Sequence, residues 1–459
     1  MDWERRHFVE KDISFRFPVS KFEKIKYDED ETLPYEKRRP SIWRDWQELR
    51  ELMEGVRPST SDSSGEGLSR PLRPSSDIKI VHRFSFNWSD QKNLEEIFRK
   101  NVVLLLDHSG PQTWDRTHVE ELLQLRAETQ VPVHVLNQRT LEDPICVSST
   151  SIRDVIDEGL SPNHRALNVL SIPLTSPSSV STIEKLLDSD TTSWNSTVTH
   201  PEALMPSVPP KTKWWGMVTL SGCIHSPHID ASGLCTAIHV AVGYKFFIVA
   251  TDSASFSLVG LRKKDQSIEE CVRRAKWRVV VIPPGGTLFL PAGTMHYAFT
   301  PETTCGAPPG AIARGSHFYS WSRLPDTLRA LWRLRLTKDA ITNAEHAEMF
   351  TLLSRMLIDV SNRVETGSAD LPAPEDIGAL LTIIHQRVDL GYDTRLSPLH
   401  TAAVELSSLR ADILIAKFKA DMPEIFEAWK KEQARLSHWI HDCTDLIPGE
   451  LSKLQSLNQ

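Results

Sequence analysis

The amino-acid sequence predicts an α+β protein with a β-rich centre. Between Leu167 and Tyr319, short apolar runs are separated by Gly, Pro and Ser, a pattern typical of the strands of a β-sandwich or barrel. After Pro325 the apolar residues recur at helical spacing, and before residue 167 strand-like and helix-like segments alternate. These three observations divide the chain by structural type.

The chain before residue 167 is predicted to contain three parts. In the N-terminal segment 1–56, residues 41–56 predict a short helix with Ser41 at its N-cap. Residues 57–76 predict a flexible linker, because their Ser, Pro and Gly offer almost no apolar surface to offset the entropy of ordering. Residues 77–166 predict a mixed α/β region, with strands at 78–84, 101–107 and 131–136 and helices at 94–100, 118–129 and 151–160. No glycine-rich phosphate loop follows the second of these strands, which disfavours a nucleotide-binding fold.

The remaining two regions are predicted to be a β-rich region, 167–324, and a helical region, 325–459. Strands are expected at 214–220, 235–242, 245–250, 277–282, 287–293, 295–300 and 317–321. Helices are expected at 326–336, 344–364, 375–388, 399–420 and 423–442. Pro325, Pro398 and Pro423 fall where helices can begin, and Gly391 falls where one can end.

The composition excludes several classes of protein. A formal net charge of -7 over 459 residues argues against a strong nucleic-acid footprint, which needs clustered Lys and Arg. The sequence has no secretory signal pattern and no apolar run long enough to span a bilayer, so we expect no membrane partner and a location in the nucleus or cytoplasm. The six cysteines are dispersed and form no C-x-x-C pair, which indicates neither a disulfide scaffold nor a zinc ribbon.

A histidine and an aspartate lie just ahead of the apolar run at 235–250. His228 and Asp230 are two residues apart, and in an extended strand residues i and i+2 project from the same face. An imidazole and a carboxylate can therefore meet at one point as two metal ligands. A hydrogen-bonded surface pair is the competing interpretation, because an isolated H-x-D tripeptide is common by chance.

A third candidate ligand follows a tight turn. His296 is preceded by Gly285, Pro291 and Gly293 at the spacing G-x5-P-x-G-x2-H. Glycine lets the chain reverse without steric cost and proline fixes one dihedral, so this histidine is delivered to a defined place. Two histidines and one carboxylate are the facial triad that favours non-haem Fe(II) and leaves coordination positions open. A structural zinc site would instead be closed by four protein ligands.

A lysine interrupts one of the apolar runs. Lys245 begins the segment KFFIVA, which otherwise reads as core. A buried ammonium needs an anionic partner, because an unpaired charge in a dry interior is costly. The carboxylate of a cosubstrate is one such partner. In the alternative interpretation the lysine lies at a strand edge, with its stem packed and its head in water.

Three motifs together resemble the jumonji-C (JmjC) domain of the Fe(II)- and 2-oxoglutarate-dependent dioxygenases, a branch of the cupin-like superfamily. The motifs are H-I-D at 228–230, G-x-K-x-F at 243–247 and P-x-G-x-x-H at 291–296. The resemblance covers about 167–321 and implies a double-stranded β-helix (a jelly-roll, cupin-like core) over 167–324. It also implies that His228, Asp230 and His296 are the catalytic iron ligands, and that Lys245 pairs with the distal carboxylate of the cosubstrate 2-oxoglutarate.

The sequence departs from this family at one position. Many members have a threonine three residues before the first histidine, where its hydroxyl helps to hold the cosubstrate. Here that position is His225, with Ser226 beside it. Either side chain can donate a hydrogen bond, so the cosubstrate pocket is altered or its register differs by one residue. Thr236 and His317 are further candidates for this pocket, while His239 is interpreted as either a pocket group or a core histidine.

The resemblance implies an oxygenase that hydroxylates a protein or peptide, with histones among the candidate substrates. If the oxidised carbon is an N-methyl group, the product falls apart and the outcome is demethylation. Two alternatives stay open: a catalytically inactive jumonji-like scaffold that binds partners, and a cupin metalloenzyme that does not use 2-oxoglutarate. The complete triad argues against the scaffold, and Lys245 with the single carboxylate argues against the other cupin activity.

The last predicted helix has a broad apolar stripe. It is formed by Ile425, Phe426, Trp429, Leu436, Trp439 and Ile440. This stripe is expected to pack on the preceding helices. The alternative is a homodimer formed through the C-terminal helices.

Overall fold

We describe the fold from a computed structural model of the 459-residue chain. The described residues are 15–16, 78–82, 91–106, 113–115, 123, 125–126, 128–136, 145–162, 164–174, 187–200, 210, 213–251, 277–303, 308–337, 347–387, 390 and 398–443. The helix expected at 41–56, the linker expected at 57–76 and the helix end expected at Gly391 lie outside these residues. Most of the helix expected at 118–129 does so as well.

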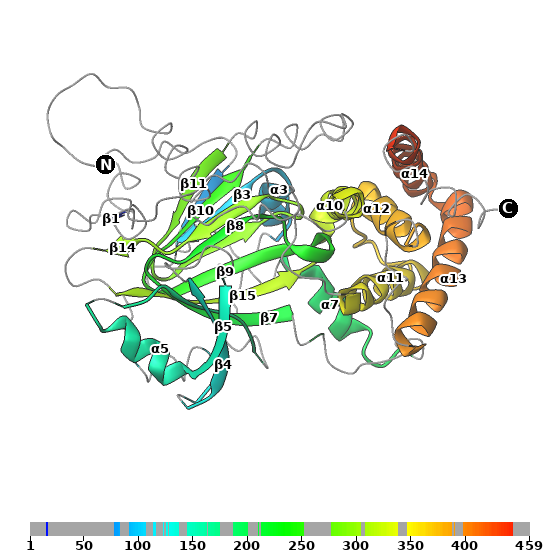
Figure 1. Cartoon of the computed structure of the whole chain (residues 1–459). Coiled ribbons are helices and arrows are strands. Elements are labelled where there is room, and N and C mark those ends of the chain that lie inside the picture. Colours follow the sequence, from blue (N-terminus) through cyan, green and yellow to red (C-terminus); the bar gives the residue numbers. More distant parts are fainter. Residues whose placement is uncertain are drawn as a thin grey trace, which may run out of the picture.

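The protein is mixed α/β, with largely antiparallel sheets and a group of helices (Figure 1). One sheet has nine strands in the order β2-β3-β12-β9-β15-β7-β6-β4-β5, and a second has four in the order β11-β10-β13-β8. Their bounds are β2 Ile78–His82, β3 Val102–Leu106, β4 Gln130–Leu136, β5 Ile145–Ser151, β6 Leu167–Pro173, β7 Trp214–Leu220, β8 Ile224–His228, β9 Cys235–Val242, β10 Lys245–Ala250, β11 Trp277–Ile282, β12 Gly286–Leu290, β13 His296–Phe299 and β15 Gly310–Phe318. A small pair joins β1 (Phe15–Arg16) to β14 (Glu302–Thr303).

The nine-stranded sheet combines both regions that the sequence divides at residue 167. Strands β2 to β5 belong to the predicted mixed region, yet they hydrogen-bond into the same sheet as β7, β9, β12 and β15. Only the β2 and β3 pair is parallel in this sheet. The lead-in strands therefore extend both edges of the sheet that carries the central strands.

The two large sheets pack against each other through apolar side chains. The nine-stranded sheet contributes Met217, Ile238, Val240, Leu288, Leu290 and Ala313, and the four-stranded sheet contributes Phe247, Val249, Val280, Ile282 and Ala298. Alternate residues of the nine-stranded sheet point the other way and pack with helix α5 (Ile152–Gly159) or helix α3 (Gln91–Lys100). We call the volume between the two sheets the intersheet space. It is a core into which every second residue of each facing strand points.

The C-terminal helices form a second core beside the sheets (Figure 1). They are α10 Leu324–Thr337, α11 Phe350–Glu365, α12 Pro374–His385, α13 Pro398–Asp421 and α14 Pro423–Cys443. The short helix α7 (Ser189–Ser196) packs with them through the buried Trp194. On α14, Ile425 and Leu436 are buried in this core and Phe426, Trp429 and Trp439 pack against it. These five residues of the apolar stripe thus pack within the chain, and a homodimer stays a prediction.

The sequence located most of these elements. All five C-terminal helices and all seven central strands form, and Ser151 caps α5 in a reciprocal capping box as expected. The strand expected at 317–321 is the end of a longer one, β15. The elements that were not identified include the strands β1, β5, β6, β8 and β14 and the helix α7. Within the described part of the chain, no helix is both long and apolar enough to cross a bilayer.

Candidate metal centre

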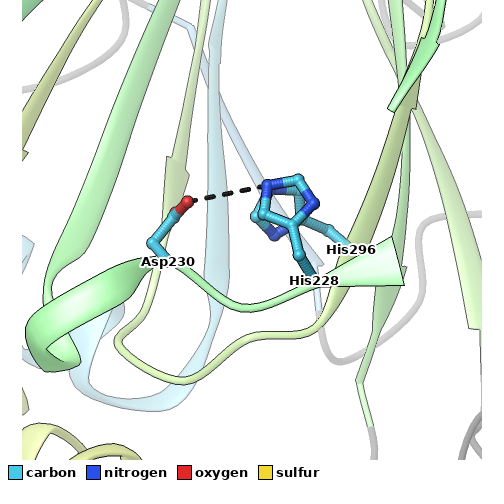
Figure 2. A group of neighbouring side chains, drawn as sticks. All are labelled: His228, Asp230 and His296. Carbon is cyan, nitrogen blue, oxygen red and sulfur yellow. Dashed lines mark ion pairs between the residues drawn. The ribbon is translucent and has the colours of Figure 1, made fainter. Parts of the chain in front are cut away.

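Three side chains converge at the end of the four-stranded sheet: His228, Asp230 and His296 (Figure 2). Each offers one ligand atom, and these atoms all lie within 4.8 Å of one another. His228 Nε2 is 3.9 Å from an oxygen of Asp230, and the two imidazole rings have centroids 4.4 Å apart. The side chains of His228 and Asp230 are only 11% and 12% exposed. The convergence that the sequence predicts is therefore present.

Strand pairing brings the two histidines together. In the antiparallel pair of β13 with β8, His296 lies directly opposite His228. Residues opposite each other in such a pair project from the same face with their Cβ atoms close together. The register shifts between His296 and Ala298, where the partner residue changes from His228 to His225. This irregularity ends regular pairing next to the candidate ligands.

The turn that carries Asp230 is held by its surroundings. Asp230 is extended (φ −66°, ψ 144°), so it projects from the same side as His228, as the sequence predicts. A short 3-10 turn follows, in which Gly233 has φ +63° and lies so close to α10 that an added Cβ would be 2.9 Å from the carbonyl oxygen of Thr327. Thr327 also donates a hydrogen bond to the Gly233 carbonyl (2.8 Å). Tyr319 donates another to the Ser232 carbonyl (2.9 Å).

The turn before His296 packs on the same helix. Gly293 has φ +68°, and a Cβ there would lie 2.9 Å from the Cβ of Ala330 on α10. The backbone N–H of Thr294 donates to the Pro291 carbonyl (3.2 Å), which closes the turn. The expected tight turn therefore forms, and α10 supports both turns that present candidate ligands.

Hydrogen bonds orient two of the three candidate ligands. The Nδ1 of His296 lies 3.0 Å from the Thr294 carbonyl, which can only accept, so Nδ1 carries a proton and Nε2 is the nitrogen that can bind a metal. The Thr236 hydroxyl donates a short hydrogen bond to Asp230, and its oxygen lies 3.0 Å from His317 Nδ1. Because that hydroxyl has only one proton, His317 must donate to Thr236. Such outer contacts are how proteins fix the orientation of metal ligands.

The electrostatic surroundings favour the ionised form of Asp230. Burial alone would raise its pKa, but the charges of His296, His317 and His228 and the hydrogen bond from Thr236 lower it below its usual value. A carboxylate that stays ionised is the form that binds a metal.

The donor set fits one divalent metal ion. Metal–ligand bonds of about 2.1 Å at right angles put neighbouring ligand atoms about 3 Å apart, so these side chains need only small rotations to share an ion. Two imidazole nitrogens and one carboxylate oxygen are suitable ligands for iron among other first-row metals. The geometry allows a metal ion and does not select which one.

Lys245, the predicted cosubstrate anchor, is fully buried at the start of β10. Its Nζ has no hydrogen-bond partner among the described residues. Burial lowers its pKa to about 8, and only the nearby Cys223 opposes this shift. The strand-edge interpretation is wrong, because that interpretation needs the ammonium in water. A buried ammonium without a partner points to a missing anion.

The other predicted pocket residues occupy different places. Thr236 and His317 contact the Asp230 carboxylate as described above, and His225 bonds Asn168 on β6 through Nε2 (3.0 Å). Ser226 lies in β8, but its side chain is outside the described part of the chain. His239 faces away from the intersheet space, since its neighbours Ile238 and Val240 point into it, and it bonds the Thr287 hydroxyl (3.0 Å).

Sequence reasoning missed a buried charged cluster behind the centre. The ammonium of Lys213 is fully buried and donates to Asp188 (3.1 Å) and to Asp190 through a shorter contact. Burial and the adjacent Asp188 raise the pKa of Asp190 well above its usual value. Asp190 accepts the backbone N–H of Tyr319 (2.8 Å), the residue that also holds the Asp230 turn. No local pattern links residues 188 and 213, so only the fold could reveal this cluster.

Comparisons with known proteins add no relative. No model of a known protein family matches the chain, and no curated protein matches its sequence. The site therefore has to be interpreted from its own residues.

Proposed function

We propose that this protein is an Fe(II)- and 2-oxoglutarate-dependent oxygenase that acts on a protein or peptide. One observation carries the proposal: the two histidines of the His228, Asp230 and His296 group and the unpartnered ammonium of Lys245 come from the same four-stranded sheet, and Asp230 lies two residues past its strand β8. The three-residue group can bind a metal ion, and the ammonium of Lys245 can bind a carboxylate of a cosubstrate. The facing sheets also fit a double-stranded β-helix, which we propose as the fold of the central region.

Each residue has a defined part in this proposal. His228, Asp230 and His296 would hold iron and leave coordination positions open for small ligands. Bound iron would supply the activation of oxygen, coupled to the oxidative decarboxylation of 2-oxoglutarate. Lys245 would form an ion pair with the distal carboxylate of that cosubstrate, in a dry setting where such pairs are strong. The apolar residues between the sheets would exclude water from the reacting groups.

The choice between hydroxylation and demethylation depends on the carbon that is oxidised. Oxidation of a carbon–hydrogen bond on a peptide gives a stable alcohol, whereas oxidation of an N-methyl group gives a product that loses formaldehyde. We propose a peptidyl substrate, with histones among the candidates, and a location in the nucleus or cytoplasm. Mass spectrometry of methylated histone peptides and of a cell extract, before and after reaction, would register a gained oxygen or a lost methyl.

The reaction test uses purified protein with Fe(II) and 2-oxoglutarate, mixed without oxygen. Succinate formed on adding oxygen supports the proposal. Asp230→Ala is the matched variant, because it removes a candidate iron ligand while Thr236 and His317 remain. Absence of succinate from the wild-type protein, with or without candidate peptides, would favour a scaffold or a metalloenzyme of another kind. Equal succinate from wild type and Asp230→Ala would remove the assignment of the site.

A further inference from the structure

A group of polar side chains lies deep in the intersheet space, beyond the candidate metal centre. It consists of Asn168, Thr219, His225, Lys245 and Thr300, and we call it the distal chamber. Lys245 and Thr219 are fully buried, and Asn168 and Thr300 are buried at 5% and 1% exposure. Polar side chains in such a place need partners, since an unmade hydrogen bond in a dry interior is costly.

Strand register brings these residues to one level. In the pair of β10 with β13, Phe246 lies opposite Phe299, and continuing that register by one residue puts Lys245 opposite Thr300. In the pair of β6 with β7, Asn168 lies opposite Thr219. Residues opposite one another share a face of their sheet. The chamber therefore combines Asn168 and Thr219 of the nine-stranded sheet with Lys245 and His225 of the four-stranded sheet and with Thr300, which follows β13.

Two hydrogen bonds cross between the sheets at this level. The hydroxyls of Thr219 and Thr300 lie 2.8 Å apart, and Asn168 Nδ2 lies 3.0 Å from His225 Nε2. These contacts show that all four side chains point into the intersheet space rather than away from it. Thr300 lies four residues beyond His296, about 13 Å along the strand direction. The long side chain of Lys245 and a short ligand can share that span.

The hydrogen-bond inventory of the chamber is incomplete. Lys245 Nζ has no partner among the described residues, and neither does the side-chain oxygen Oδ1 of Asn168. If the Asn168 amide is turned over, its oxygen accepts from His225 and its two N–H donors become the unpartnered group. Thr219 has a second acceptor in reach, the Ala311 carbonyl, but at a long 3.5 Å. When Thr219 donates to Thr300, the Thr300 proton is available to a further oxygen.

An ammonium, an amide and a hydroxyl with unmet capacity make a site for an anionic oxygen group. We propose that Lys245, Thr300 and Asn168 together bind the distal carboxylate of a dicarboxylate, with the Asn168 amide turned over so that its N–H groups donate to the ligand and its oxygen accepts from His225 Nε2. This inference rests on the proposed function, since it takes 2-oxoglutarate as the dicarboxylate. It assigns the role of the missing threonine to residues from other strands. His225 then acts through Asn168 and does not touch the ligand.

Several residues on the inner faces beside the chamber have small side chains. On β15 the residue opposite Thr219 is Ala311, and the residue opposite Met217 is Ala313, so small side chains follow each other on the inner face. Ala298 lies between His296 and Thr300 on β13. The apolar walls of the chamber would make each charged hydrogen bond stronger than it is in water.

Calorimetric titration of Mn(II)-loaded protein with 2-oxoglutarate, without oxygen, tests this inference by binding alone. Replacing Thr300 by Val keeps its shape and removes the hydroxyl, and the loss of a hydrogen bond to a charged group corresponds to a Kd about tenfold to a hundredfold higher. Thr300→Ser keeps the hydroxyl and should bind like wild type. Asn168→Asp puts a second carboxylate into the chamber, where it would repel the ligand, and should weaken binding at least as much as Thr300→Val. The matched control is Thr287→Val, a buried threonine on the opposite face of the nine-stranded sheet.

A second ligand shows which part of 2-oxoglutarate accounts for the binding free energy lost in the variants. 2-Oxobutyrate has the keto acid of 2-oxoglutarate but no distal carboxylate, so Thr300→Val and Asn168→Asp should leave its Kd unchanged. If wild type binds 2-oxoglutarate and Lys245→Met weakens it, while Thr300→Val and Asn168→Asp bind like wild type, this inference is overturned and the proposed function stands. If wild type binds no 2-oxoglutarate at all, both fall. Thermal melts establish that each variant is folded. If Asn168→Asp does not fold, the comparison of Thr300→Val with Thr300→Ser still tests the inference.

Discussion

Replacing Thr236 by Val should weaken metal binding without changing any of the three candidate ligands. Valine has nearly the shape of threonine, so the change removes the hydroxyl that donates to Asp230 and accepts from His317. A hydrogen bond to a charged group contributes about 1.5–3 kcal/mol. Its loss raises the pKa of Asp230, because the hydrogen bond from Thr236 is one of the interactions that hold that pKa down.

The expected consequence is a Kd for Mn(II) about tenfold to a hundredfold higher, the range seen when partners of metal ligands are lost. The difference should widen as the pH falls, because protons compete with the metal for the Asp230 carboxylate. Calorimetric titration at several pH values measures both effects. Thr236→Ser should restore wild-type affinity, and Thr287→Val is the control for removal of a buried hydroxyl. A Thr236→Val protein that binds Mn(II) as tightly as Thr287→Val would refute the reasoning.

Three further variants test the surroundings of the centre. Lys245→Met should stabilise the protein by about 3 kcal/mol at pH 7, because the folded protein releases that proton near pH 8 and the unfolded chain near pH 10.4. As the pH rises between those values, the free energy of unfolding of the wild-type protein should approach that of the variant. A Lys245→Met protein that is less stable than wild type in urea titrations at pH 7 would contradict this. Lys213→Ala leaves a buried carboxylate unpaired and should cost about 3–5 kcal/mol in the same assay, so a loss below 1 kcal/mol counts against the buried cluster. Gly293→Ala forces a Cβ into the left-handed region and against Ala330, which should cost at least about 1–2 kcal/mol and weaken Mn(II) binding; unchanged values for both would show that this turn does not position His296.

The candidate metal centre was predictable because its signals are local. His228 and Asp230 share a face through the two-residue period of an extended chain, and Gly293 marks the turn before His296. The C-terminal helices were equally visible, because a 3.6-residue apolar period and an initial proline are properties of one segment. In such cases a few residues close together in the sequence determine the local structure.

The distal chamber was not predictable in the same way. Only Lys245 and His225 were identified as candidates, whereas Asn168, Thr219 and Thr300 look like ordinary polar residues in apolar strands. Their significance comes from the register of three strand pairs and from the contact between two sheets, and no short pattern encodes either. The Lys213 cluster escaped for the same reason, since its carboxylates come from α7, a polar helix without an apolar period.

The central claim is that three side chains share one metal ion. Anaerobic titration of the purified protein with Fe(II), read by calorimetry, tests it directly, with His228→Ala, Asp230→Ala and His296→Ala measured alongside. The account predicts one ion per chain for the wild-type protein and loss of that binding in each variant. Unchanged stoichiometry and affinity in the three variants would contradict it.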